Sequence, residues 1–540
     1  MGVCAPKEHD LVKPLKGKLL PISAITNNSR LDSITEQYDF IRVIGYGQFG
    51  TVREATKSDQ TNTDTPNLKH YAIKSISKSR VKDHLPLLQN ELSILRLVDH
   101  PNIIKLYEIY EDSLYIHLVT ELCMGGDLYE YLSEKENLNE LEVAKIMMKI
   151  LTAVNHLHIL HICHRDLKPE NVMFTNQNED RELKLIDFGL SAKYSDEMLE
   201  SMVGTPYYLA PEVLKGSYSK ECDVWSLGVI MYLLLSGKHP FKGSTMRDLF
   251  RNIYNGQYSF IEPIWSKISS QAKNLIARML AVNPETRITV QEALRHEWFV
   301  IVKSNTQPKI NLEVFSSIKR NKAKSKLWQV AMRVLVRNLS PEQIDDLKNM
   351  FFEIDQRKTG FVTAHDIEVC MNKNGYELAR EEFKELTSKI SEIGKGRLNY
   401  TQFLIAALDR KQIFEEENLW NVFRVFDHDG NGCINLSDLK FALEKAGCYI
   451  SDSEYQEILE EFELKFCEKL DYDEFRNIMG CFSEVQTAEN SMFLSENTMI
   501  RRTIRKLSSR KITTRRASVY EAMRRVRRAT DMPRSVKDSI

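Results

Sequence analysis

One short segment contains three polar residues whose types and spacing suit the transfer of a phosphoryl group. The segment runs from His164 to Asn171 and includes a Lys168-Pro169 step. In such an arrangement Asp166 would accept the proton of an attacking hydroxyl, Lys168 would steady the moving phosphoryl group, and Asn171 would hold magnesium. A surface turn is the alternative, because short motifs recur by chance. The prediction therefore depends on partners elsewhere in the chain.

A glycine-rich segment upstream would bring backbone amides close to phosphates. It follows an alternating, strand-like run and contains Gly45, Gly47 and Gly50, with Val52 two positions later. A dinucleotide-binding loop has the same glycine spacing. The next strand-like run ends in Lys74, which favours a nucleotide hairpin in which this lysine pairs with the α- and β-phosphates of ATP.

Three further segments would complete the nucleotide site. Glu91 lies in a stretch with helical periodicity and would hold Lys74 in place. The strand-like run up to Thr120 leads into a hinge that would bind adenine, and Asp187 in Asp187-Phe188-Gly189 would supply the second magnesium carboxylate. The residues expected around the nucleotide are Ile44, Gly45, Gly47, Gly50, Val52, Ala72, Lys74, Glu121, Cys123, Asp127 and Asp187.

The segment after Asp187 ends at Ala210-Pro211-Glu212, and Arg287 is expected to pair with Glu212. Arg165 is the kind of arginine that docks a negative charge from this segment. Ser201 would supply that charge as a phosphoserine, unless Glu197 or Glu200 substitutes for it permanently. An unmodified surface serine is the alternative.

In their order and spacing, these elements resemble the eukaryotic protein kinases. The resemblance implies an α+β, bilobal kinase fold over residues 38–299 that uses ATP and magnesium. Lys168 and Gly204-Thr205-Pro206 resemble the serine/threonine type. Asp127 and Glu170 resemble the acidic pair with which basophilic kinases bind arginine before the acceptor residue.

A basic amphipathic segment follows the predicted kinase domain. Apolar residues recur at helical spacing over residues 312–337, with lysines and arginines between them. A charged linker helix is one explanation. The other is a segment that a calcium-sensing lobe grips or that blocks a basophilic substrate site. Ser325 remains in this segment, so it is also a candidate for phosphorylation.

A repeat of about 36 residues over 340–478 has the pattern of paired EF-hands, an all-α module of two lobes. The third loop predicts a calcium site, although the shorter Asp438 stands where a bidentate Glu is expected. The first loop has Arg357 at a ligand position, which weakens the expectation of calcium there. The expected ligands are Asp427, Asp429, Asn431, Cys433 and Asp438 in the third loop, and Asp355, Thr359, Phe361 and Asp366 in the first.

The second and fourth loops, aligned by Leu398 and Leu470, place Lys395 and Lys465 at ligand positions and should be structural. The order of kinase, basic junction and four EF-hands resembles the calcium-dependent protein kinases over residues 38–480. The resemblance implies that calcium releases an autoinhibitory junction. A calcium-insensitive brace is one alternative, and a noncatalytic calcium-binding scaffold is another.

Composition and charge complete the expectations. The 540 residues have a formal net charge of −1, yet residues 501–540 contain fourteen Lys or Arg and three Asp or Glu, which makes them +11. Ser518 follows two arginines in this tail and is a third phosphorylation candidate.

The nine cysteines include no Cys-x-x-Cys pair, which argues against a zinc site or a disulfide framework and favours a reducing compartment.

A cytoplasmic monomer that acts on protein substrates and has no nucleic-acid partner is expected. Lipidation of Gly2 and Cys4 would add peripheral membrane association, although Pro6 departs from the motif. The predicted divisions are 1–37 extension, 38–299 kinase domain, 300–339 junction, 340–410 EF-hands 1 and 2, 411–483 EF-hands 3 and 4, and 484–540 tail.

Overall fold

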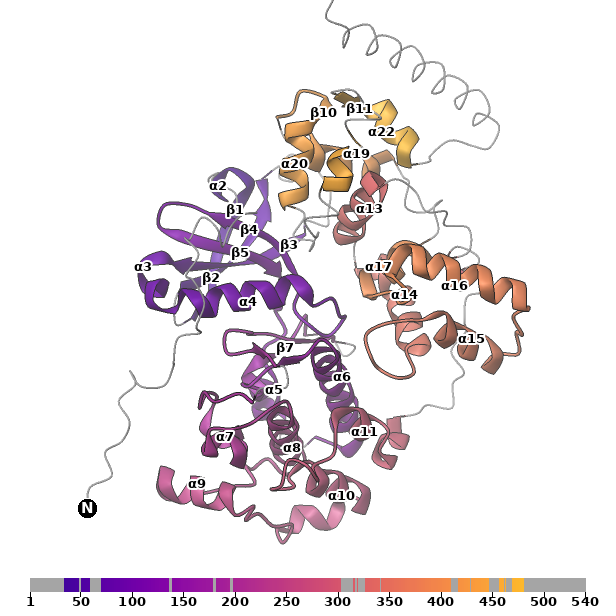
Figure 1. Cartoon of the computed structure of the whole chain (residues 1–540). Helices are drawn as coiled ribbons and strands as arrows, with labels where there is room; N and C mark the ends of the chain where they lie inside the picture. Colours follow the sequence, from indigo (N-terminus) through magenta and orange to yellow (C-terminus); the bar gives the residue numbers. More distant parts are fainter. Residues whose placement is uncertain are drawn as a thin grey trace, which may run out of the picture.

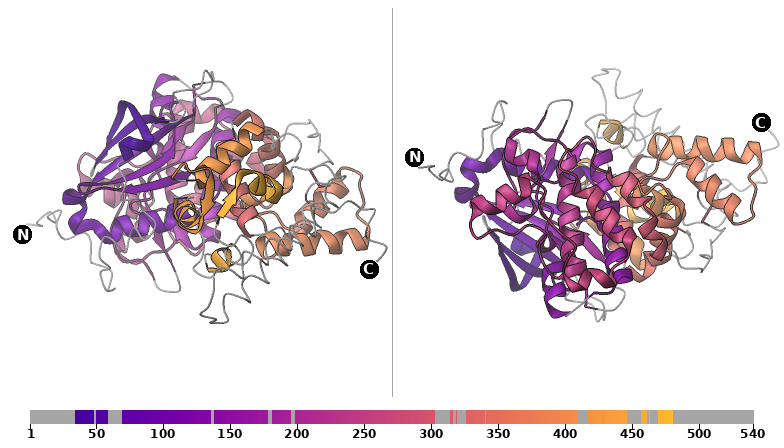
Figure 2. Two further views of the ribbon diagram at one scale, coloured as in Figure 1. Left: turned by 90° about the horizontal axis from the view of Figure 1, so that it is seen from above. Right: turned by 90° about the horizontal axis from the view of Figure 1, so that it is seen from below.

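The structure is a computed structural model in which a two-lobed domain lies beside a helical module (Figure 1). Seen from above and below, the helical module stays on one side of the two-lobed domain (Figure 2). The structure describes residues 34–47, 50–58, 69–135, 138–177, 181–194, 198–302, 314–315, 318, 326–339, 341–408, 416–427, 429–445, 456–460, 462 and 469–479.

A five-stranded antiparallel sheet forms the first lobe, in the order β1-β2-β3-β5-β4. The strands are β1 (Tyr38–Gly47), β2 (Gly50–Lys57), β3 (His70–Ser77), β4 (Leu106–Glu111) and β5 (Tyr115–Glu121). The β2-β3 register places Val52 opposite Lys74. A Cβ on Gly50 would lie 1.8 Å from the Ser75 carbonyl oxygen, so this position needs glycine.

Helix α4 lies in the first lobe with the sheet and contains Glu91, in the stretch where the sequence showed helical periodicity. Its apolar face buries Leu88, Leu92 and Ile94, and Pro86 stands in its first turn, where a missing N–H costs no helical hydrogen bond. The helices of this lobe are α2 (Ile34–Gln37), α3 (Lys78–Val81), η3 (Lys82–His84) and α4 (Leu85–Leu97).

The second lobe is mainly helical and is built around α8, whose residues from Cys222 to Leu235 are all buried. Its helices are α5 (Leu128–Glu134), α6 (Glu140–Ile159), η4 (Pro169–Asn171), η5 (Pro206–Tyr208), α7 (Pro211–Lys215), α8 (Glu221–Ser236), α9 (Met246–Tyr254), η6 (Pro263–Lys267), α10 (Ser270–Met279), α11 (Val290–Leu294) and η7 (Glu297–Val302). Two small hairpins carry the loops of the site: β6 (Ile162–Cys163) with β9 (Ala192–Lys193), and β7 (Val172–Phe174) with β8 (Leu183–Leu185).

The helical module contains paired helix-loop-helix units. A bridge joins Val362 to Leu398 in one pair, and Ile434 lies opposite Leu470 in the other. These pairings confirm the predicted alignment of the second and fourth loops. The elements are α13 (Lys326–Asn338), α14 (Pro341–Ile354), α15 (Ala364–Lys373), α16 (Arg380–Gly394), α17 (Tyr400–Ala407), α19 (Glu416–Phe426), β10 (Cys433–Asn435), α20 (Leu436–Lys445), β11 (Lys469–Asp471) and α22 (Tyr472–Met479).

Helix α13 is the link between the two pairs of EF-hands. It packs on α17 of the first pair and on α19 of the second, as Figure 1 shows. The apolar residues predicted at helical spacing are buried there, namely Leu327, Val330, Ala331, Val334 and Leu335. The EF-hand module therefore contacts the apolar face of α13.

No helix in the described part of the chain is long and apolar enough to cross a membrane. The described cysteines are all free thiols: Cys123, Cys163, Cys222, Cys370 and Cys433.

Candidate active site

Lys74 and Glu91 form the ion pair that the sequence predicted, with 3.0 Å between Nζ and Oε1. The sheet supplies the lysine and α4 supplies the carboxylate, so the pair ties the helix to the strand. Burial acts to lower the pKa of Lys74, but the charges of Glu91 and Asp187 outweigh it and raise the pKa above its ordinary value. The ammonium group therefore stays charged and is suited to binding an anion.

The catalytic-loop residues converge on one carboxylate. Asp166 Oδ2 lies 2.8 Å from Lys168 Nζ and accepts a 3.2 Å hydrogen bond from Asn171 Nδ2. Its Oδ1 accepts from the Thr205 backbone N–H at 3.0 Å and from the Thr205 hydroxyl at 2.8 Å. Burial alone would raise the pKa of Asp166, yet the hydrogen bonds from Lys168 and Thr205 hold it below its usual value. The carboxylate is ionised at neutral pH.

A second carboxylate, Asp223 on α8, fixes the backbone at the start of this loop. Its oxygens accept from the backbone N–H groups of His164 and Arg165, each at 2.9 Å, and lie 2.9 Å from His158 Nε2. Arg165 has φ 69°, a left-handed conformation that is unfavourable for this residue type. The buried carboxylate therefore holds a strained turn, a role that the motif analysis missed.

Asn171 and Asp187 have the oxygen atoms that a magnesium ion prefers. The Ile186 N–H donates to the Asn171 carbonyl at 2.9 Å, which places the two segments side by side. The Asn171 amide nitrogen is occupied by the backbone carbonyl of Asp166 at 2.8 Å, so the amide oxygen is the atom available to a cation. Asp187 follows β8 with φ 61°. These residues fit the predicted magnesium site.

The predicted nucleotide residues lie along the strands and the hinge. In the β1-β2 hairpin Gly45 is opposite Val52, and Gly47 is opposite Gly50. Ala72 is on β3, and Ile44 is on β1. The hinge begins at Glu121, the last residue of β5, whose Oε1 lies 2.9 Å from Lys184 Nζ. Cys123 is buried, which raises the pKa of its thiol to about 12. Asp127 caps α5 by accepting from the Glu130 N–H at 2.8 Å.

Within the described residues, Arg165 donates hydrogen bonds to neutral groups. Its Nη1 donates to the Tyr218 hydroxyl at 3.2 Å and its Nε to the Leu190 carbonyl at 2.5 Å. The Tyr218 hydroxyl in turn donates to the Ser201 carbonyl at 2.6 Å. Tyr218 is joined to Leu199 by a β-bridge and so lies beside this segment, and a phosphate on Ser201 stays a prediction.

The predicted pair between Arg287 and Glu212 is confirmed. The guanidinium binds both carboxylate oxygens, with Nη1 to Oε1 at 2.5 Å and Nη2 to Oε2 at 2.9 Å. The Arg287 side chain is fully buried and that of Glu212 is 6% exposed. This two-point pairing fixes the end of the segment that carries Thr205.

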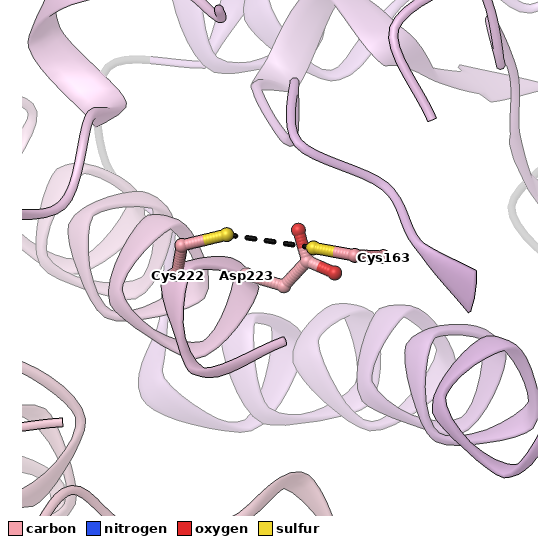
Figure 3. A group of neighbouring side chains, drawn as sticks. All are labelled: Cys163, Cys222 and Asp223. Atoms are coloured by element: carbon pink, nitrogen blue, oxygen red, sulfur yellow. Dashed lines mark hydrogen bonds between the residues drawn. The ribbon is translucent and has the colours of Figure 1, made fainter. Parts of the chain in front are cut away.

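A group of two thiols and a carboxylate lies behind the catalytic loop (Figure 3). Cys163 and Cys222 have sulfur atoms 3.4 Å apart, beside Asp223. Burial raises the pKa of the Cys163 thiol well above its usual value, and Asp223 is already hydrogen-bonded to the loop backbone. Neutral thiols and an occupied carboxylate do not favour a metal. The group is part of the support of the loop.

In the third EF-hand loop, expected ligand residues accept hydrogen bonds from the loop backbone. Asp427 accepts from the N–H groups of Asn431 at 3.1 Å and Gly432 at 2.9 Å. Asp438 accepts from the Asn435 N–H at 2.9 Å. Asp429 and Asn431 are exposed, and Cys433 begins β10.

The first EF-hand loop contains a cation of its own. Arg357 Nη2 lies 3.0 Å from Asp366 Oδ2. Asp355 is fully buried and accepts from the N–H groups of Thr359 at 2.9 Å and Gly360 at 2.7 Å. The Phe361 carbonyl, expected as a ligand, accepts from the Thr359 hydroxyl at 3.0 Å.

Several sequence predictions lie outside the described residues. These are the lipidation sites Gly2 and Cys4, the candidate phosphorylation sites Ser325 and Ser518, Glu197, Lys465 and the basic tail.

Comparisons with known proteins agree with this geometry. The protein kinase domain family matches residues 38–299, and an EF-hand domain family matches residues 418–447. Calcium-dependent protein kinase 5 of Plasmodium falciparum (isolate 3D7) is 36% identical over 456 residues, covering 83% of this chain and 78% of that protein. Calcium-dependent protein kinase SK5 of Glycine max is 37% identical over 456 residues, covering 83% and 88%.

A third relative, calcium-dependent protein kinase 33 of Arabidopsis thaliana, is 34% identical over 446 residues, covering 82% of this chain and 84% of that protein. The predicted α+β class, with a kinase fold followed by EF-hands, is confirmed. The chain belongs to the calcium-dependent protein kinase family and is a serine/threonine protein kinase.

Proposed function

We propose that this kinase transfers the γ-phosphate of ATP through Asp166, Lys168, Asn171, Asp187 and Lys74. The observation that supports the proposal is the set of contacts around Asp166, where Lys168 and Thr205 meet one ionised carboxylate. That carboxylate would orient the substrate hydroxyl and accept its proton. Lys74, held charged by Glu91, would bind the α- and β-phosphates.

Magnesium held by Asn171 and Asp187 would neutralise the charge that develops on the phosphates. Lys168 lies 3.0 Å from the Thr205 hydroxyl as well as beside Asp166. It can therefore position the phosphoryl group while Thr205 orients the proton acceptor. Most of the catalytic effect would come from this positioning and charge stabilisation, as in other phosphoryl transfers.

Calcium control is proposed to act through the third EF-hand loop, with Asp427, Asp429, Asn431, the Cys433 carbonyl and Asp438 as ligands. The third loop follows α19 directly, and α19 packs on α13. A change in the third loop would thus reach the junction helix directly. Since Asp438 is shorter than the expected Glu, the affinity for calcium should be modest.

A basic substrate motif is proposed from the positions of Asp127 and Glu170. Asp127 caps the start of α5 at the hinge side of the site, and the exposed Glu170 lies within η4 of the catalytic loop. Two carboxylates around the substrate site would favour arginine over neutral residues. The measurement is kcat/KM for two peptides that differ only by arginine or alanine three positions before the acceptor serine, with Glu170→Gln as the matched variant. Equal values for both peptides in the unmodified enzyme would remove the proposal.

One assay separates the possible modes of control. Full-length enzyme is given a basic peptide and ATP, with calcium or with a chelator. Loss of phosphorylation in the chelator supports calcium control through the EF-hands. Unchanged phosphorylation supports the alternative in which the module is a calcium-insensitive brace, and absence of phosphorylation in both conditions supports a noncatalytic scaffold.

We propose that lipid attachment at Gly2 and Cys4 places the monomeric enzyme at membranes. Its protein substrates would lie at the membrane or in the cytoplasm. Two lipid signals are what stable anchoring requires. Sedimentation with vesicles, comparing the enzyme with its Gly2→Ala variant, tests the anchoring. Equal sedimentation of the two proteins contradicts it.

A further inference from the structure

The first EF-hand loop is in direct contact with the kinase domain. Asn155 on α6 donates its amide to the Lys358 carbonyl at 2.6 Å. His156, the next residue, has Nδ1 3.0 Å from the Thr359 carbonyl. A carbonyl can only accept, so the His156 proton is on Nδ1. Two consecutive carbonyls of a calcium-binding-type loop are thus bound by one helix of the kinase domain.

The approach of loop and helix is close enough to require glycine. A Cβ on Gly360 would lie 2.3 Å from His156 Nδ1, and Gly360 has φ 76°. The rings of His156 and Phe361 have centroids 5.0 Å apart. The tip of the loop therefore fits against α6 through both backbone and side-chain contacts.

A second set of contacts joins the same EF-hand pair to the kinase domain. Asp99, in the segment between α4 and β4, accepts from the Thr401 N–H and from the Thr401 hydroxyl, each at 2.9 Å. Thr401 lies in the first turn of α17, where an incoming carboxylate is favourable. Lys348 on α14 also forms an ion pair with Glu182, which precedes β8. Three elements of the first EF-hand pair touch the kinase domain.

The interior of the first loop explains how it keeps its shape without calcium. The guanidinium of Arg357 pairs with Asp366 at the twelfth position of the loop. Asp366 also accepts from the Thr363 N–H at 2.9 Å and from the Thr363 hydroxyl at 2.6 Å. Asp355, at the first position, is occupied by the N–H groups of Thr359 and Gly360. Asp427 accepts from the corresponding N–H groups of the third loop, so the pairing of Arg357 with Asp366 is what sets the first loop apart.

We propose that the first EF-hand loop is a docking element in which Arg357 replaces calcium. The guanidinium holds the loop in the conformation that presents the Lys358 and Thr359 carbonyls to Asn155 and His156. The first EF-hand pair consequently stays on the kinase domain in the presence and in the absence of calcium. This rests on the proposed function only in assigning the calcium response to the third loop.

The test uses the Lys348–Glu182 pair of the full-length enzyme as a reporter. A carbodiimide joins amine and carboxylate groups that are in contact, and mass spectrometry measures the cross-linked peptide. For the unmodified enzyme, the yield with calcium and with chelator should agree within twofold. Arg357→Asp removes the internal cation and adds a carboxylate at a ligand position, so its yield should fall at least fivefold in chelator and recover with calcium.

Arg380→Asp is the matched control, because Arg380 is exposed at the start of α16, and its yield should equal that of the unmodified enzyme in both conditions. Asn155→Ala removes a docking contact without changing the loop and should lower the yield with and without calcium. The inference is overturned if the unmodified enzyme needs calcium for the cross-link, or if Arg357→Asp behaves like Arg380→Asp. Kinase activity measured in the same samples separates this result from the proposed calcium control: a constant cross-link with calcium-insensitive activity would contradict only the latter.

Discussion

Asp166 in the catalytic loop and Asp366 in the first EF-hand loop have similar partners, but they join different parts of the chain. Each is a mostly buried carboxylate that pairs with a basic side chain of its own loop, Lys168 at 2.8 Å and Arg357 at 3.0 Å. Each also accepts from a threonine hydroxyl. The threonine of Asp366 is three residues away in the same loop, whereas Thr205 reaches Asp166 from 39 residues away. The contacts of Asp366 thus stay within one loop, whereas those of Asp166 hold together two segments that are distant in the sequence.

The largest effect is expected for Asp166→Asn, which removes the charge and keeps the shape. An amide cannot accept the hydroxyl proton, so kcat should fall by about 10²–10⁴-fold, as for loss of a general base. The measurement is steady-state phosphorylation of a basic peptide. Arg357→Gln, which unpairs the other carboxylate of the comparison, should leave kcat with saturating calcium within about twofold. A similar loss of kcat in both variants would show that the two pairs do not differ as described.

The next largest effect is expected for Asp223, the carboxylate that holds the backbone of the catalytic loop. Asp223→Asn replaces a carboxylate that accepts from two backbone N–H groups. The oxygen of the new amide can accept from one of them, whereas its NH2 group faces the other. The free energy of unfolding should decrease by about 3 kcal/mol, the range for breaking a buried charged contact. Denaturant unfolding measures the decrease, with Asp39→Asn, at an exposed position of β1, as control.

A pH series sharpens that prediction. Burial would raise the pKa of Asp223, but the hydrogen bond from His158 and the neighbouring backbone donors hold it below its usual value. The stability it contributes is therefore present above the ordinary pKa of about 3.9 and is lost as the pH falls through the lower folded value. The unmodified enzyme should lose part of its stability in this acidic range. Identical acid profiles for the enzyme and Asp223→Asn would contradict the assignment.

Short-range signals in the sequence predicted most of the catalytic site. Lys74, Asp166 and Asp187 stand in motifs whose spacing follows from strand, loop and turn geometry, and pairs such as Glu91 with Lys74 follow from the chemistry that the motif needs. The same reasoning could not find Asp223 or Tyr218. Asp223 accepts from two backbone N–H groups and Tyr218 donates to a backbone carbonyl, and such groups, which every residue has, give no signal in the sequence.

The contacts between the two parts of the chain were equally hidden from the sequence. Asn155 and His156 lie on a helix whose other residues are mainly apolar, and there each reads as an ordinary polar residue. Their acceptors are the carbonyls of Lys358 and Thr359, atoms that carry no side-chain signal. Only Arg357, a cation at a calcium-ligand position, indicated that this loop has a role other than calcium binding.

A smaller effect should separate the first and third EF-hand loops. Asp427→Asn removes a charged ligand from the third loop and should weaken calcium binding on the order of tenfold, because affinity follows ligand charge. Asp355→Asn is the same change at the same position of the first loop, where Arg357 already pairs with Asp366 at the twelfth position, so this change should alter the calcium affinity little. Calorimetric titration of both variants is the measurement. Equal losses of affinity would place calcium in both loops.

The smallest effect concerns Arg165, whose partners in the described structure are neutral. Burial raises the pKa of Tyr218 to about 12, so its hydroxyl stays protonated and can accept from Arg165 while it donates to the Ser201 carbonyl. Tyr218→Phe removes both hydrogen bonds, each worth about 1 kcal/mol, and kcat should fall about three- to tenfold. Ser201→Ala retains the carbonyl and should keep full activity if the tyrosine orders this segment. If instead Ser201→Ala is impaired and Tyr218→Phe is active, a phosphate on Ser201 supplies the partner of Arg165, and the catalytic loop depends on a charge added after synthesis.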